Sequence, residues 1–199
     1  MSTCDFLKEL ESQSVEYLSN WLEKIKPGHR ERVNQIIRSF CNHYGLQETC
    51  VDLMLLNNYQ NIGEPLVIHL ITQERSLDQE EKKLVRRHPI LSAHVLESRG
   101  FEEKIGADLF SEILMHHERW DGKGYFGVKG ERIPLLCRIL FPIDFFVAIT
   151  SKRPHRPAVP PETALDEIHY QSGKMFDPDV VKKLVDSIEN PIMTMGCAR

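Results

Sequence analysis

The sequence has no long apolar run, no paired-cysteine motif and no block of basic residues. No apolar stretch approaches the ~18 residues of a membrane span, so no membrane association is expected. The charged beginning, MSTCDFLKELESQ, is unlike a signal peptide, and the five cysteines form no CxxC pair. We therefore expect reduced thiols and a cytoplasmic location. The net charge of −4 at pH 7 argues against nucleic-acid binding, which needs a basic face.

The sequence also lacks the sustained period-two alternation of apolar and polar residues that strands would show. Helical spacing is present instead. Between Gly28 and Gly45, apolar residues recur at i, i+3, i+4 and i+7, which predicts an amphipathic helix ended by a glycine. Asp177 followed by Pro178 predicts the start of a last helix, because aspartate is a good N-cap and proline suits the first turn. The predicted fold class is all-α.

Three further predictions concern the bounds of single helices. Ser76 and Gln79 have the spacing of a capping box, which predicts a helix start at that point. Residues 103–117 are expected to form one helix. Pro142 lies inside the apolar segment IPLLCRILFPIDFFVAIT and is expected to kink or break its helix.

The stretch HHERWDGKGY, from His116 to Tyr125, carries the strongest chemical signal. Two adjacent imidazoles end a predicted helix directly before a loop rich in glycine, and Asp121 and Asp144 follow downstream. Imidazole and carboxylate groups are ligands of divalent transition metals. A histidine pair alone is weak support for a metal site, since most single histidines are surface or core residues. The pair therefore marks a candidate site without defining it.

From His29 to Asp177 the chain resembles the HD-GYP family, the bacterial metal-dependent phosphodiesterases that act on cyclic dinucleotides. The resemblance rests on segments that occur in the family's order: HRERV, RRHPILSAHVL, HHERWDGKGYFGVKGERIPLLCRI, DFFVAITSKRPHR and MFDPDVV. It implies an HD-superfamily helical bundle. Residues 27–199 would form the HD-GYP-like domain, and residues 1–26 an N-terminal helical extension.

The resemblance also places the family's metal ligands. Those that are chemically intact are His29, His88, His116, His117 and Asp144. The family pattern LLHDIGKIGIP lies over LLNNYQNIGEP, so the histidine–aspartate pair falls on Asn57 and Asn58, and the lysine falls on Asn61. In the family the aspartate bridges two metal ions, whereas an asparagine offers only one neutral carbonyl oxygen. No catalytic pair is therefore intact.

What remains is expected to hold at most one divalent transition metal ion, which would be zinc, iron, nickel or manganese. His88, His116 and His117 fall on the family's ligands at one metal position. Three imidazoles and a water molecule are an acceptable ligand set for such an ion. His29 and Asp144 alone are too few ligands to bind a second ion tightly.

The resemblance implies a ligand pocket as well. Tyr125 falls on the family's ligand-contacting tyrosine, and Arg153 and Arg156 fall on its phosphate-binding cations. One guanidinium group can donate two parallel hydrogen bonds to two oxygens of a phosphate, which fits that role. The loop GYFGVKG has Phe126 where the family has proline, and it is one residue shorter. Two outcomes remain open: an open pocket that binds cyclic di-GMP, or a closed one that leaves a surface for a protein partner.

The favoured function is a degenerate HD-GYP-like signalling protein without phosphodiesterase activity. It would act through signalling protein partners or as a cyclic dinucleotide receptor. The alternative is a metal-dependent phosphodiesterase or phosphohydrolase that uses the residual histidine-rich metal site. A third possibility is a scaffold that binds neither metal nor nucleotide. The asparagine pair argues against the alternative, and the retained ligands argue against the scaffold.

Overall fold

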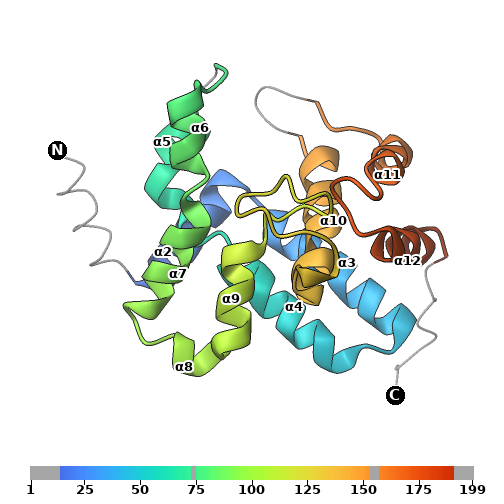
Figure 1. The fold of residues 1–199 in the computed structure, drawn as a ribbon, viewed down its shortest axis with the longest axis horizontal. Helices are drawn as coiled ribbons and strands as arrows, with labels where there is room; N and C mark the ends of the chain where they lie inside the picture. Colours follow the sequence, from blue (N-terminus) through green and yellow to red (C-terminus); the bar gives the residue numbers. More distant parts are fainter. Residues whose placement is uncertain (1–13, 73–74, 153–156, 191–199) are drawn as a thin grey trace.

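The computed structural model describes residues 14–72, 75–152 and 157–190, which form helices joined by loops (Figure 1). The α-helices are α2 (Val15–Ile25), α3 (His29–Tyr44), α4 (Gln47–Tyr59), α5 (Ile68–Ile71), α6 (Gln79–Val85), α7 (His88–Glu97), α8 (Glu102–Ile105), α9 (Ala107–Met115), α10 (Leu135–Thr150), α11 (Pro161–Tyr170) and α12 (Pro178–Glu189). Two 3-10 helices are η1 (Glu64–Val67) and η2 (Gly130–Arg132). Within the described ranges, β pairing is limited to an isolated bridge between Ser172 and Phe176. The predicted all-α class is confirmed.

The centre of the bundle is formed by α3, α4 and α10, which pack against one another, with α12 on α3 and α11 on α10. Their apolar faces supply fully buried side chains such as Ile37, Leu53 and Ile143. Burying a side chain of this size contributes about 1.5–3 kcal/mol. Figure 1 shows α11 and α12 on the opposite side of the molecule from α5 and α6. In the part of the chain that the structure describes, no helix is both long and apolar enough to cross a membrane.

Helix ends follow the capping residues. As predicted, α3 ends at Gly45, which has the positive φ of +68° that glycine adopts without strain. The predicted start of α12 is also confirmed, since the Asp177 carboxylate accepts a hydrogen bond from the backbone N–H of Asp179. Leu18 on α2 is fully buried in the same core, and α2 packs against η1. The C-terminal end of α2 therefore lies close to the segment LLNNYQNIGEP.

Three predictions of helix bounds need correction. The capping box at the start of α6 is formed by Asp78 and Glu81, not by Ser76 and Gln79, because the Asp78 carboxylate accepts from the Glu81 N–H and the Glu81 carboxylate accepts in return. The segment 103–117 is two helices, α8 and α9, separated at Gly106 with φ +81°. Of the kink or break expected at Pro142, the break does not occur, because α10 runs without interruption from Leu135 to Thr150.

Glu112 on α9 predicts a pH dependence of stability. Burial, together with the charges of Asp52 and Asp108, raises the pKa of Glu112 from 4.5 to about 7. The folded state therefore favours the protonated form, so this group's contribution is complete below pH 4.5 and is lost as the pH rises towards 7. We expect Glu112→Gln to raise the free energy of unfolding at pH 8 by about 1 kcal/mol, allowing for partial solvent screening. Urea unfolding at pH 8 and pH 4.5 tests this, and an equal change at both pH values would contradict it.

Candidate functional site

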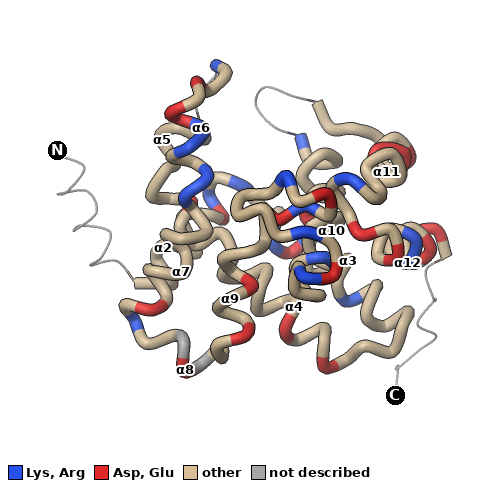
Figure 2. The backbone as a smooth tube through the Cα atoms, in the orientation of Figure 1, with Lys and Arg blue, Asp and Glu red and all other residues tan. Residues whose placement is uncertain are grey.

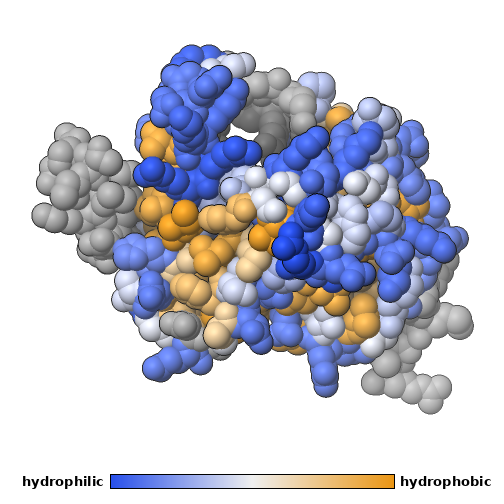
Figure 3. Space-filling model, viewed as in Figure 1, coloured by the Kyte–Doolittle hydropathy of each residue, from blue (hydrophilic) through white to orange (hydrophobic). Residues whose placement is uncertain are grey.

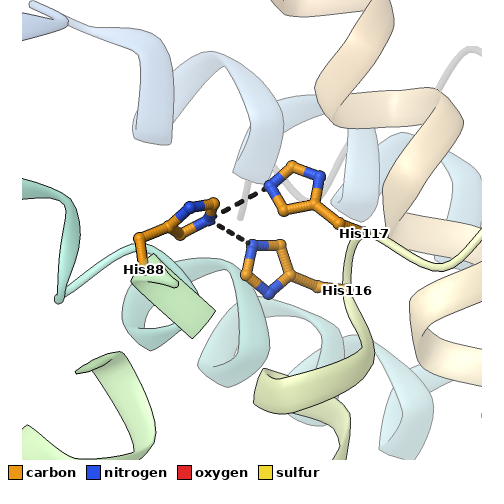
Figure 4. A group of neighbouring side chains, drawn as sticks. All are labelled: His88, His116 and His117. Carbon is orange, nitrogen blue, oxygen red and sulfur yellow. Dashed lines mark hydrogen bonds between the residues drawn. The ribbon is translucent and has the colours of Figure 1, made fainter. Parts of the chain in front are cut away.

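Three histidines from two separate segments meet at one point. His88 begins α7, whereas His116 and His117 directly follow α9. The Nε2 atom of His88 lies 3.1 Å from the Nε2 atom of His116 and 3.1 Å from that of His117. Figure 4 shows the three imidazole rings pointing toward one another, and their ligand atoms all lie within 4.8 Å. His88 and His116 are buried and His117 is partly buried. The sequence prediction that these residues form one group is consistent with this geometry.

The proton positions on two of these rings follow from their backbone contacts. Nδ1 of His88 lies 2.8 Å from the carbonyl oxygen of Val85. Nδ1 of His116 lies 2.7 Å from the carbonyl oxygen of Ile113. Since a carbonyl only accepts, Nδ1 carries the proton in both neutral rings and Nε2 presents a lone pair. Two lone pairs that face each other repel unless a cation lies between them. The same backbone support orients histidine ligands in metal sites.

Burial keeps the three imidazoles neutral, which is the form that binds metals. It lowers the pKa of His116 to about 3 and holds the pKa of His117 well below its usual value, and the neighbouring histidines add to both effects. Burial also lowers the pKa of His88. Zinc–nitrogen bonds at tetrahedral angles place ligand nitrogens about 3.3 Å apart, close to the spacing here. The donor set therefore fits one divalent transition metal ion.

The other half of the family's centre is arranged differently. Nε2 of His29 lies 2.9 Å from Oδ1 of Asp144, so these two residues, which the resemblance implies as metal ligands, pair with each other. Burial opposes ionisation of Asp144, but the hydrogen bond and charge of His29 outweigh it and lower the pKa of Asp144. The charge of Asp144 also acts on His88 and His116. The His29–Asp144 pair and the three-histidine cluster are therefore close enough to interact electrostatically.

Asn57, at the family's histidine position, contributes to helix packing. It is buried in α4, and its Nδ2 donates to the Asn34 side-chain oxygen at 2.8 Å and to the Arg30 carbonyl at 3.1 Å, both on α3. Asn58 and Asn61 line a small cavity of about 30 Å³ beside His29. That volume holds only one or two water molecules. The asparagines therefore border a cavity that is too small for a nucleotide.

An ion pair that the sequence analysis missed lines the same cavity. The Lys26 ammonium lies 2.8 and 2.6 Å from the two carboxylate oxygens of Glu64, and Glu64 is only 8% exposed. The charge of Lys26 acts on all three clustered histidines and on Asp144. A signal was present in the sequence, because Glu64 stands where the pattern LLHDIGKIGIP has an isoleucine. A carboxylate at an apolar position predicts a buried partner, although the partner itself could not be named.

The segment that carries Glu64 is fixed against α7. The Ser92 hydroxyl accepts from the Gly63 N–H at 2.9 Å and donates to the Gln60 carbonyl at 2.8 Å. Any side chain at Gly63 would collide with this helix, since a Cβ atom there would lie 2.5 Å from the Ser92 nitrogen. Ser92 stands where the family has a glycine. The hydroxyl thus holds Glu64 in place for Lys26.

Removing Lys26 is expected to destabilise the fold. Lys26→Met leaves the Glu64 carboxylate buried without its partner, which should lower the free energy of unfolding by about 2 kcal/mol, allowing for the partial exposure of Lys26. Lys26→Met combined with Glu64→Ile should recover most of this loss, because no buried charge remains. Lys24→Met, on the exposed face of α2, is the matched control. Chemical denaturation of the variants measures the effect. A double variant with a lower free energy of unfolding than Lys26→Met would contradict the assigned pairing.

Tyr125 connects the histidines with a basic residue. Its ring stacks on His117 with centroids 4.8 Å apart and planes 29° apart. The Arg86 guanidinium lies 4.8 Å from the centre of the same ring. The buried Glu118 carboxylate holds the loop by accepting from the N–H of Phe126 at 2.7 Å. The Phe126 side chain is 52% exposed.

The other two members of the predicted ligand pocket, Arg153 and Arg156, lie outside the described residues. The sequence analysis did not select Arg86. The RRHP segment contained it, but nothing in the sequence indicated that its guanidinium would lie over Tyr125.

The chain is similar to curated proteins whose names describe cyclic di-GMP phosphodiesterases. It is 31% identical over 184 residues to the cyclic di-GMP phosphodiesterase of Thermotoga maritima, a match that covers 89% of this chain and 48% of that protein. It is 29% identical over 194 residues to the cyclic di-GMP phosphodiesterase response regulator RpfG of Xanthomonas campestris, covering 93% of this chain and 50% of that protein. The chain thus spans about half the length of these relatives.

Solved structures share the fold. Bd1817, an HDG"Y"P protein from Bdellovibrio bacteriovorus, matches with a TM-score of 0.62 and 16% identity, over 81% of this chain and 51% of that one. The cyclic GMP-AMP specific phosphodiesterase V-cGAP3 of V. cholerae matches with a TM-score of 0.63 and 23% identity, over 85% and 45%. The HD domain family matches residues 12–180. Because this match covers most of the chain, and the fold and relatives agree with it, the chain is an HD-GYP-like member of the HD domain family.

Proposed function

We propose that this chain is a signalling domain that binds a cyclic dinucleotide without hydrolysing it and holds at most one metal ion. The observation that carries the proposal is the Lys26–Glu64 ion pair, which lines the cavity beside His29, Asn58 and Asn61. These asparagines fall on the family's aspartate and lysine positions. The ammonium and the carboxylate neutralise each other and together lie beside the positions where the family would hold a second cation.

A two-metal centre acts by clamping the attacking and leaving oxygens of the substrate between its ions. The bridging carboxylate that keeps two cations close together is replaced here by a neutral amide at Asn58. The Glu64 carboxylate is already paired with Lys26, and Asp144 is already paired with His29, so neither carboxylate is free for a further cation. These features support the proposal that the family's second metal position binds no ion in this chain.

One ion fits the remaining donors. His88, His116 and His117 would hold it through their Nε2 atoms, and Val85 and Ile113 fix two of the rings by accepting from Nδ1. When bound, the ion would supply positive charge to a phosphate and lower the pKa of a bound water molecule. The complete three-histidine set is also the observation that favours the second candidate, a phosphohydrolase that uses one ion.

Calorimetry with cyclic di-GMP and 3′3′-cGAMP tests the proposal, with chromatography of the same samples afterwards. We expect micromolar binding and recovery of intact ligand after manganese loading. Turnover that is abolished by His116→Ala would establish the one-ion hydrolase instead. No heat at millimolar ligand would refute nucleotide binding and leave action through a signalling protein partner as the function.

A further inference from the structure

A second, larger pocket has Tyr125 among its lining residues. It is formed by α6, the junction between α6 and α7, and the loop that carries Tyr125. Its lining residues are Leu77, Gln79, Lys82, Lys83, Val85, Arg86 and Tyr125. Its volume is about 520 Å³, within the range of roughly 300–1,000 Å³ that small-molecule sites occupy. The pocket is therefore large enough for a nucleotide-sized ligand, unlike the cavity beside His29.

The polar lining of this pocket is cationic, with no carboxylate among the lining residues. The acidic residues of α6 are already engaged: Glu80 pairs with Lys83 at 2.6 Å and Glu81 pairs with Arg75 at 2.6 Å. Among the described residues, no ion pair involves Lys82 or Arg86. Figure 2 shows basic residues along α6 and at its junction with α7, and Figure 3 shows this face to be strongly hydrophilic. The positive charges of Lys82 and Arg86 therefore have no carboxylate partner among the described residues.

Arg86 and Tyr125 connect this pocket to the histidine cluster. The guanidinium lies 4.8 Å from the Tyr125 ring centre, and the same ring stacks on His117, with centroids 4.8 Å apart. Tyr125 thus lines the pocket and also contacts the histidine cluster. The guanidinium also forms a side-chain hydrogen bond with Tyr125. These two contacts limit its orientations, and its remaining N–H groups can donate to an anion.

We infer that Lys82, Arg86 and Tyr125 form a binding site for a phosphodiester group of a cyclic dinucleotide, an inference that rests on the proposed function. Arg86 donates in a bidentate manner to two phosphate oxygens, and Lys82 adds a point charge. Tyr125 offers its ring edge or hydroxyl to the ligand. This site is independent of Arg153 and Arg156, and it requires no metal ion, because its charges belong to the chain.

The test is calorimetry of metal-free protein with cyclic di-GMP, using Arg86→Ala against the matched control Arg87→Ala. Arg87 is the exposed neighbouring arginine that does not line the pocket. We expect Arg86→Ala to weaken binding by at least about tenfold, as expected for the loss of charge-assisted hydrogen bonds. Arg87→Ala should change binding by less than about twofold. Thermal melts confirm that both variants remain folded, which is expected because both side chains are exposed.

The possible outcomes separate the inference from the proposed function. If wild-type protein binds cyclic di-GMP and Arg86→Ala binds equally well, the site is wrong and the receptor function stands. If the two arginine variants lose affinity equally, general surface charge explains binding and the site is again wrong. If inorganic phosphate displaces cyclic di-GMP at the same concentration, the site recognises free phosphate, which overturns the dinucleotide assignment. If wild-type protein shows no binding at millimolar ligand, the proposed function itself fails.

Discussion

Asn57→His together with Asn58→Asp will not restore a second metal ion. These changes return the family's histidine and aspartate, but the Lys26 ammonium still lines the cavity with Glu64 at 2.6 Å. The Lys26 ammonium neutralises the Glu64 carboxylate, the ion pair takes up room beside the cavity, and Asp144 remains paired with His29, so a second divalent cation finds too few free donors. Metal analysis after loading with manganese or iron should therefore still give at most one ion per chain.

Adding Lys26→Ala and Glu64→Ile to the same variant should change the result. With the ion pair removed, the cavity is larger, and the new carboxylate at position 58 can bridge two ions. We expect the metal content to rise towards two ions per chain. The variant with only Lys26→Ala and Glu64→Ile is the control, and it should stay at one. A second ion in the variant that keeps Lys26 would show that the ion pair does not exclude it.

His116→Ala should abolish metal binding at the proposed three-histidine site. The change deletes one of three protein donors and also the ring whose Nδ1 is fixed by Ile113. Loss of even a supporting contact costs about 10–100-fold in metal affinity, so loss of a direct ligand should cost at least about 100-fold. Under loading that saturates the wild type, the variant should retain less than about a tenth of an ion per chain.

The control for this variant is His169→Ala, because His169 is an exposed histidine on α11. It should bind metal as the wild type does. Circular dichroism shows whether His116→Ala remains helical, since His116 is buried and its truncation leaves a cavity. Equal metal content in His116→Ala and the wild type would place the ion elsewhere.

Helix positions that depend on local chemistry could be predicted from the sequence. Gly45 and Asp177 mark helix ends because their effects operate within one turn. The capping box was misplaced by two residues because Ser76 and Asp78 both offer a suitable side chain, and the choice depends on which one pairs with Glu81. Helix α10 continues through Pro142 although proline removes a backbone donor, and its many buried apolar residues are consistent with packing that outweighs this cost.

The candidate site also combines residues that the sequence could predict with contacts that depend on tertiary packing. The resemblance to the family implied His88, His116 and His117 as one ligand set, and the mutual contacts of these residues agree with it. The Lys26–Glu64 pair was missed because its members are 38 residues apart and meet only through the packing of α2 on η1. The stacking of Arg86 on Tyr125 is likewise a tertiary contact with no local signature. The sequence therefore predicts which of the family's ligands are missing, but it does not predict that Lys26 and Glu64 lie beside those positions.

Anomalous diffraction from crystals grown with manganese or iron tests the central claim, that an ion pair of the chain has replaced half of a metal centre. The account predicts one anomalous peak, bonded to the Nε2 atoms of His88, His116 and His117, with the Lys26 ammonium still on Glu64. Two or three fully occupied peaks, one of them between Asn58 and Asp144, would contradict it.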